Sequence, residues 1–384
     1  MKYFTNNVIW SVSIFLLLIV VSGCDGSIDK TFGGPDYDEG SFISQTSDDG
    51  FIITGSTQSK GAGKSDLWLL KLNNEGNIVW DKTFGGSNHD AGACVLETSD
   101  GGFMIVGRTQ SFGNGGKDIW LIKTDSEGNK EWSKTYGSKG LDEGSYIIET
   151  NNGNYIVTGN FSPGNSTSTV GSDIFVMMVN NTGDRIWSKT FGGDHELSDD
   201  YGIIVKMVTD DDLIVLGVLN DFLSNEIKGL IIKLDQDGNT LWDKKLDNLW
   251  PKDIIVDSDG NYLISGTRND NLIIIKLGHT GEHLDSAERR NNSIEKGGYI
   301  WQMDDKGYIL AGSTDGHSNG KLDAIILKTD ALKNSVWEKY FGGSSHDQIN
   351  SGVLTNGGYL VLTGSTESKG EGKTDLWFIK LPVK

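Results

Sequence analysis

The stretch WDKTFGGSNHDAGACVLETSDGGFMIVG at residues 80–107 decides the fold, because it recurs along the chain. It returns as WSKTYGSKGLDEGSYIIETNNGNYIVTG at 132–159, and an earlier copy, IDKTFGGPDYDEGSFISQTSDDGFIITG, occupies 28–55. In each copy a glycine closes an apolar run, and the seven such glycines lie 46 to 58 residues apart: Gly55, Gly107, Gly159, Gly217, Gly266, Gly312 and Gly364. Self-similarity at this period is typical of a repeat architecture.

Each repeat contains four strand signals separated by turns. In the second repeat these are GACVLET, GFMIVGRT, DIWLIKT and KEWSKTYG, with SDGG and DSEGN as tight hairpin turns. The third strand is almost continuously apolar in most copies, and strands of that kind need cover on both faces. No stretch after residue 24 has sustained helical periodicity. The chain is therefore expected to be all-β.

Seven four-stranded units that cover one another predict a seven-bladed β-propeller. The seventh unit stops after its third strand, at DLWFIKLPVK, whereas IDKTFGG at 28–34 matches a fourth strand that lacks a blade of its own. We therefore expect the N-terminal strand to complete the last blade and close the ring. The fifth unit is the most divergent, since it is shortened and has Asp285 near the place of a recurring tryptophan.

The repeats read roughly as W-S-K-T-[FY]-G-G, D-x-G, T-S-D-G-G-[FY], D-[IV]-[WFY]-L-[IV]-K and D-x-x-G-N-x-x-W. Over about residues 28–381 this resembles the β-propeller repeat family of bacterial and archaeal extracytoplasmic proteins, known as SBBP-like repeats. The resemblance implies the propeller fold. It brings no catalytic residues with it, because the family shares none.

The N-terminal residues have the pattern of an export signal. The apolar run VIWSVSIFLLLIVV has 14 residues, which is the length of a signal-peptide core and short of the roughly 20 that cross a bilayer as a helix. It ends in Val21-Ser22-Gly23-Cys24, which resembles the lipobox of bacterial lipoproteins. That resemblance implies cleavage before Cys24 and a diacylglycerol on its sulfur. The alternative is an ordinary signal peptide in which Cys24 is incidental.

We divide the chain into a lipoprotein signal peptide at 1–23, a short lipid-anchored tether at 24–27 and a single propeller domain at 28–384. The protein is then expected in the cell envelope, anchored to membrane lipid and facing outside the cytoplasm. The other cysteine, Cys94, lies in the apolar run ACVLET, and we interpret it as a buried small hydrophobe.

Two classes of partner or activity are disfavoured. Lys and Arg total 34 against 53 Asp and Glu, a formal net charge of -19 that would repel a phosphate backbone, so no nucleic-acid partner is expected. The segment KGAGKSDLWLLK at 60–71 resembles the end of a P-loop, but Gln58 stands where the first glycine is needed and a strand follows instead of a helix. No NTPase site is implied.

Aspartates recur at two positions in most repeats. Five precede the first strand (Asp38, Asp90, Asp142, Asp200 and Asp347), and five begin the third (Asp66, Asp118, Asp173, Asp323 and Asp375). Both positions fall at the same end of a propeller, where they could form an acidic rim that binds Ca²⁺ or another cation. The favoured alternative is that each aspartate accepts backbone N–H bonds from the adjoining loop. No cofactor is expected otherwise.

Other recurring side chains have structural explanations. Trp80, Trp132, Trp187, Trp242 and Trp337 are expected to pack at the outer blade edge, with a sugar-stacking surface as the alternative. His89, His195 and His346 belong to separated blades, so neither a shared zinc site nor a Ser-His-Asp arrangement is expected. Two loops break the repeat, at 160–173 and 218–229. Their Phe161, Phe222 and Leu223 either contact a partner or fold back on their own blade.

These observations predict a membrane-anchored extracytoplasmic propeller that serves as a non-catalytic binding platform for a protein or glycan partner. One alternative is a propeller hydrolase or lyase with an acidic active site at one end of the channel. A second is an envelope-assembly factor, an analogy based on fold and anchor alone.

Overall fold

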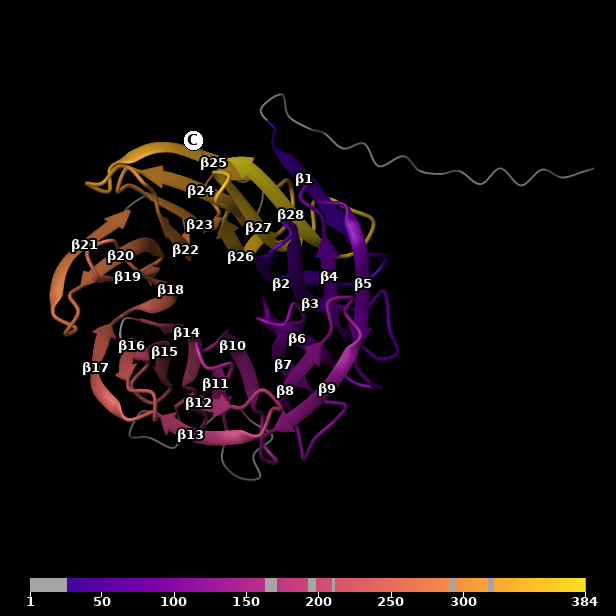
Figure 1. The fold of residues 1–384 in the computed structure, drawn as a ribbon. Coiled ribbons are helices and arrows are strands. Elements are labelled where there is room, and N and C mark those ends of the chain that lie inside the picture. Colours follow the sequence, from indigo (N-terminus) through magenta and orange to yellow (C-terminus); the bar gives the residue numbers. More distant parts are fainter. Residues whose placement is uncertain are drawn as a thin grey trace, which may run out of the picture.

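The computed structural model describes residues 26–162, 171–192, 198–208, 211–289, 295–316 and 321–383 of the chain. The described residues form 28 strands in seven four-stranded antiparallel sheets, arranged in a ring like the blades of a propeller (Figure 1). The prediction of an all-β, seven-bladed β-propeller is confirmed. In each blade we call the four strands A to D, from the centre of the ring outward.

Blades 1 to 3 follow chain order from A to D. Blade 1 contains β2 (Asp38–Gln45), β3 (Phe51–Thr57), β4 (Asp66–Leu72) and β5 (Ile78–Phe84). Blade 2 contains β6 (Asp90–Glu97), β7 (Phe103–Thr109), β8 (Asp118–Thr124) and β9 (Lys130–Tyr136). Blade 3 contains β10 (Glu143–Glu149), β11 (Tyr155–Phe161), β12 (Asp173–Val179) and β13 (Arg185–Phe191).

Blades 4 to 6 have the same order, and the divergent fifth repeat also forms a regular sheet. Blade 4 contains β14 (Tyr201–Met207), β15 (Leu213–Asp221), β16 (Glu226–Leu234) and β17 (Thr240–Asp247). Blade 5 contains β18 (Trp250–Val256), β19 (Tyr262–Arg268), β20 (Asn271–Leu277) and β21 (His283–Arg289). Blade 6 contains β22 (Glu295–Gln302), β23 (Tyr308–Thr314), β24 (Asp323–Thr329) and β25 (Ser335–Phe341).

Blade 7 combines strands from distant parts of the sequence. Its strands A to C are β26 (Asp347–Leu354), β27 (Tyr359–Thr366) and β28 (Asp375–Pro382), and its strand D is β1 (Ile28–Phe32). Trp377 of β28 donates its indole N–H to Asp29 Oδ1 of β1 at 2.7 Å, and Lys369 forms an ion pair with the same carboxylate at 2.5 Å. The expected closure of the ring by the N-terminal strand is confirmed.

The hydrophobic core lies between neighbouring blades. Strand C is buried along its whole length in β4 and β8, because a blade covers each of its faces. One core cluster joins Leu67 and Leu69 of blade 1 to Val95 and Ile105 of blade 2. The nearly continuous apolar sequence of strand C follows from this cover on both faces.

Tryptophans near the start of strand D support the outer edge of the ring. Each of four packs against a glycine in the C–D turn of the next blade: Trp80 against Gly128, Trp132 against Gly183, Trp187 against Gly238 and Trp242 against Gly281. These indoles and that of Trp337 are half-buried. Trp337 packs against the core cluster of blades 6 and 7. The recurring tryptophans therefore lie at the outer blade edges.

Strand A of every blade has a pairing irregularity near its start. In blade 1 the register against β3 shifts between Gly40 and Phe42, which leaves Ser41 as an extra residue, and the other six blades have an equivalent shift. A β-bulge of this kind re-aims the neighbouring side chains. In blades 1, 2, 6 and 7 the irregularity lies within two residues of a side chain that belongs to the candidate site described below.

Candidate functional site

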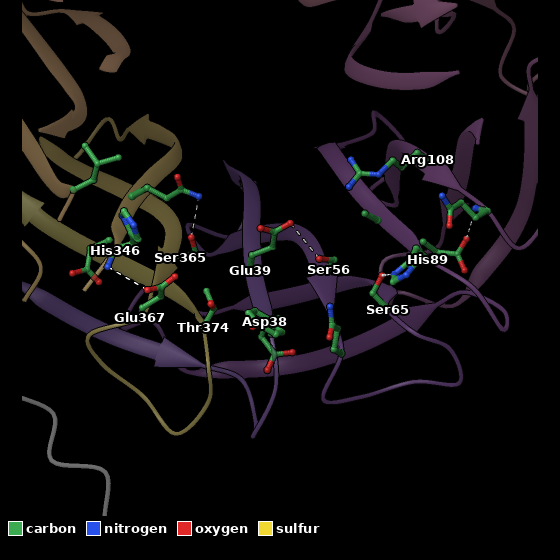
Figure 2. Close-up of a pocket in the computed structure, with 18 of the residues that line it drawn as sticks. Asp38, Glu39, Ser56, Ser65, His89, Arg108, His346, Ser365, Glu367 and Thr374 are labelled. Carbon is green, nitrogen blue, oxygen red and sulfur yellow. Dashed lines mark hydrogen bonds between the residues drawn. The ribbon is translucent and has the colours of Figure 1, made fainter. Parts of the chain in front are cut away.

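One end of the ring contains a cavity of about 730 Å³ around the inner strands. Most of its lining comes from strand A, the end of strand B and the loop before strand A in blades 7, 1 and 2. Figure 2 shows Glu39 and Ser56 of blade 1 between His346 of blade 7 and His89 of blade 2. Repeat-equivalent positions of three neighbouring blades therefore face one hollow, which we call the channel mouth.

The aspartate before strand A anchors the loop that leads into each blade. Asp38 accepts hydrogen bonds from the hydroxyls of Thr57 and Ser59, the latter at 2.6 Å, and from the amide of Gly34 at 2.8 Å. The corresponding acids of blades 2 and 7 accept hydrogen bonds from the equivalent threonine and serine. These buried bonds fix the edge of the channel mouth.

The aspartates that begin strand C lie beside those of the next blade. Five pairs result: Asp66 with Asp90, Asp118 with Asp142, Asp173 with Asp200, Asp323 with Asp347, and Asp375 with Asp38. A glycine fits closely against each pair, and a Cβ on Gly85 would lie 1.7 Å from Asp66 Oδ1 and 2.9 Å from Asp90 Oδ2. The ten predicted residues thus come together at one end of the ring. Nine are buried and Asp173 is half-buried, so they line the blade junctions instead of an open rim.

In four of these pairs at least one carboxyl has a raised pKa. Burial raises the pKa of Asp118, and the negative charge of Asp142 adds to that effect. Burial likewise raises the pKa of Asp323 and Asp375, with Asp347 and Asp38 as their respective acidic neighbours. Burial also raises the pKa values of Asp142 and Asp173.

Within the described part of the chain, Oδ1 of Asp66 and Oδ1 of Asp118 have no hydrogen-bond partner. The other oxygen of each is satisfied, since Asp66 Oδ2 accepts the amide of Ala62 and Asp118 Oδ2 accepts that of Asn114 at 3.0 Å. In the Asp118–Asp142 pair, a single proton held between the two carboxyls would satisfy Asp118 Oδ1 and remove the repulsion.

The position after the strand A aspartate, or after Leu249 and Glu295 in blades 5 and 6, holds six different residue types in the seven blades. Around the ring it holds Glu39, Ala91, Glu143, Tyr201, Trp250, Lys296 and Gln348. We call this set the variable ring. Four of its members line the large cavity, namely those of blades 1, 2, 6 and 7. Residues that do not follow the repeat therefore contribute to the chemistry of the channel mouth.

A second hollow of about 600 Å³ adjoins the first on the side of blade 5. Lys296 lines both. Trp250 is 41% exposed there, and its ring centroid lies 5.8 Å from that of Tyr201 at an interplanar angle of 60°. The irregular segment 218–229 supplies Asn225 and Ile227 to the same hollow. One of the two loops that break the repeat therefore does contribute to the site.

Charges are distributed unevenly around the channel mouth. Glu143 is neutralised by Arg108 at 3.2 Å and by Lys117, and Glu39 accepts a hydrogen bond from Ser56 at 3.3 Å. Across the mouth, Lys296 forms no ion pair with a carboxylate of the described residues. On one side Glu143 is thus held in ion pairs, whereas Lys296 on the other side has no carboxylate partner among the described residues.

Sequence reasoning missed two features of this end. Trp250 stands in a Leu-Trp-Pro segment where four other repeats have Asp-x-Gly, and that break in the pattern was the available signal. Ser65 Oγ lies 3.1 Å from His89 Nδ1, although the two residues are 24 positions apart. Only the packing of neighbouring blades brings them together. No carboxylate of the described residues has a hydrogen bond to the His89 ring.

Several other predicted residues have defined places. Phe161 stacks on Phe175 of its own blade at 5.4 Å, whereas Phe222 and Leu223 are exposed in the turn between β15 and β16. Cys94 is buried, and burial raises the pKa of its thiol to about 12.

Cys24, His195 and most of the 160–173 loop lie outside the described residues. Among the described residues there is neither a group of three or more potential metal-ligating side chains nor a helix long and apolar enough to span a membrane.

No family model and no curated protein matches the chain. Solved structures match its fold across nearly its whole length. The WD40 domain of Pan2 from Neurospora crassa has a TM-score of 0.55 at 12% identity and covers 93% of this chain and 96% of that one. Extracellular domains 1-2 of Drosophila Semaphorin 1b give 0.53 at 8% identity, with 93% and 87% covered. The polysaccharide lyase Uly1 gives 0.54 at 11%, with 91% of each chain covered. At such identities the similarity extends to the fold alone.

Proposed function

We propose that the protein is a lipid-anchored, extracytoplasmic binding platform that holds a protein or glycan partner at its channel mouth without catalysis. The observation that carries the proposal is the variable ring. Positions that support the scaffold repeat from blade to blade, as the aspartate anchors do, whereas the seven positions of the variable ring carry six different types of side chain. Loop and rim positions held on a rigid scaffold are where proteins usually place binding specificity.

The anchor in this proposal comes from the sequence around Cys24. The first strand, β1, begins at Ile28, so an extended tether of four residues would reach about 14 Å. A lipid on Cys24 would then hold the ring close to the membrane surface. Cys24→Ala should abolish the incorporation of a labelled fatty acid into the protein. Equal labelling of the variant and the wild type would contradict lipidation at this residue.

The platform is tested by chemical cross-linking of the tagged, lipidated protein in its native membrane, followed by capture. We expect one molecule to be enriched in near-stoichiometric amount. A variant with Glu39→Ala, Lys296→Ala and Gln348→Ala should lose it by about tenfold or more, since these residues face the mouth. The control is Glu75→Gln with Glu127→Gln, in turns at the opposite end of blades 1 and 2. Equal capture by all three proteins would overturn the proposal.

The contact between Ser65 and His89 favours one competing function, a hydrolase. A serine activated by a histidine needs this distance, and both side chains line the large cavity. A nucleophile of this kind also needs donors for the developing oxyanion and a group that orients the imidazole. A screen of ester, amide and glycoside substrates tests the alternative, with Ser65→Ala and His89→Ala as inactive controls. Turnover that both substitutions abolish would replace the platform proposal.

A further inference from the structure

We propose that the second hollow, which adjoins the channel mouth on the side of blade 5, is a subsite for a carboxylate-bearing saccharide. The saccharide stacks on Trp250 and places its acid group beside Lys252 and Lys296. The inference rests on the proposed function, because it names the ligand class of the same mouth. Both lysines and the tryptophan line the 600 Å³ hollow.

The exposed indole of Trp250 supplies the stacking surface. The tryptophans of strand D are half-buried beneath turns of the next blade, whereas Trp250 belongs to an inner strand and is 41% exposed. Tyr201 of blade 4 contacts it at an angle, and the following Pro251 restricts the backbone. The ring is thus held in place and still open to the hollow. A large rigid aromatic surface of this kind matches the C–H face of a pyranose.

The polar lining suits a ligand rich in hydroxyl groups. Asn225, Asn248 and Asn269 come from three short loops, and Thr267 lies next to the last residue of strand B of blade 5. Each amide offers donors and an acceptor, which is the pairing that neighbouring sugar hydroxyls require. A peptide anchored by its side chains needs apolar pockets, and the aliphatic side chain in this lining is that of Ile227 alone. The composition therefore favours a saccharide over a peptide.

The charges indicate an acidic sugar. Lys252 lies over the ring of Tyr299 at 4.9 Å, and neither it nor Lys296 pairs with a carboxylate within the described ranges. The lining has two lysines and one acid, Asp270, although the chain as a whole carries a net charge of -19. Two lysines that have no carboxylate partner among the described residues are suited to an anionic group brought by the ligand.

The hollow continues into the larger cavity at Lys296. Together the two have room for several sugar residues, so the subsite would hold one acidic unit of a longer chain. Besides Lys296, the members of the variable ring that line the continuation are Glu39, Ala91 and Gln348.

The test measures binding of the full-length lipidated protein, in detergent micelles, to hexasaccharides of galacturonate, glucuronate and mannuronate by calorimetry. Each is compared with its methyl ester, which has the same shape and no charge. We expect at least one acid to bind about tenfold more tightly than its ester. Lys296→Gln should remove this preference, whereas Trp250→Ala should weaken acid and ester alike and Trp250→Phe should restore much of the binding. Thermal melts check that the variants are folded.

The outcomes separate this inference from the platform proposal. Equal affinity for acid and ester, or a preference unaffected by Lys296→Gln, overturns the carboxylate subsite. Failure of every hexasaccharide to bind, together with capture of a protein that the mouth variant loses, overturns the saccharide and leaves the platform standing. Failure of both binding and capture overturns both.

Discussion

Lys333, in the C–D turn of blade 6, forms an ion pair with Asp285 on the outer strand of blade 5. At four other junctions the equivalent positions hold a glycine and a tryptophan, and a Cβ on Gly128 would lie 2.7 Å from the indole of Trp80. Lys333 retains the left-handed backbone of the glycine, with φ of 64°. At this junction Asp285 stands in place of the tryptophan and Lys333 in place of the glycine. An ion pair therefore replaces the packing of an indole against a glycine.

This replacement predicts strong coupling between the two positions. Asp285→Trp alone should destabilise by about 1 to 3 kcal/mol, because the indole meets the Lys333 side chain where the other junctions leave room. Lys333→Gly alone should be nearly neutral, since relief of the left-handed conformation offsets loss of the ion pair. The double variant should be at least as stable as the wild type. Urea unfolding of the four proteins measures the coupling, and additive single effects would contradict it.

Ring closure predicts a second effect on stability. Asp29 accepts the indole N–H of Trp377 and pairs with Lys369, and through these contacts it holds β1 against β28. Asp29→Ala should lower the free energy of unfolding by about 1 to 2 kcal/mol, because it leaves the indole donor without a partner. Asp81→Ala in blade 1 is the matched control, since Asp81 accepts the indole N–H of Trp68 at 3.2 Å within a continuous chain.

Both substitutions remove a hydrogen bond from an indole N–H to a carboxylate. Hydrogen exchange measured strand by strand then shows whether the loss of Asp29 weakens the blade that closes the ring. Faster exchange confined to β1 and β28 is expected for Asp29→Ala, and exchange confined to blade 1 for Asp81→Ala. Equal, global acceleration in both would argue against closure through Asp29.

The architecture could be predicted because the sequence repeats. Seven similar segments, and a fourth strand displaced to the N-terminus, determine the number of blades and the closure. The partnership of Lys333 with Asp285 was hidden, since the missing tryptophan is visible in the sequence but the residue facing it is known only once neighbouring blades are packed. The same limit applies to the site. The ten aspartates were expected at one end, whereas their pairing across junctions depends on blade geometry.

The paired aspartates predict a pH effect of definite sign. Burial and Asp142 raise the pKa of Asp118 above its ordinary value of 3.8, so the folded state binds that proton more tightly than the unfolded state does. This contribution to stability is complete below a pH of about 3.8 and is lost as the pH rises through the folded pKa. Asp118→Asn keeps a neutral donor facing Asp142, so it should stabilise the protein at pH 7. It should also weaken the fall in stability that accompanies a rise in pH above about 3.8.

Asp100 in the same blade is a control, because its pKa is shifted in the opposite direction. Although partial burial opposes it, hydrogen bonds from Thr98, Gly102 and Lys123 lower the pKa of Asp100 to about 2. Its contribution is present above its ordinary value of 3.8 and is lost as the pH falls toward 2, so Asp100→Asn should destabilise at pH 7. Thermal melts of the wild type and both variants across this pH range check the signs. A loss of stability in Asp118→Asn at pH 7 would count against the shared proton.

The same contacts predict that the fold does not depend on calcium. A calcium site needs six to eight oxygen ligands, whereas Asp38 already accepts bonds from Thr57, Ser59 and Gly34, and Asp90 accepts the equivalent set. A cation would have to displace these donors. Thermal unfolding midpoints in millimolar Ca²⁺ and in EDTA should therefore agree within error. A midpoint several degrees higher in Ca²⁺, and lost in Asp66→Asn, would instead place a cation between the paired carboxylates, where Asp66 Oδ1 has no hydrogen-bond partner among the described residues.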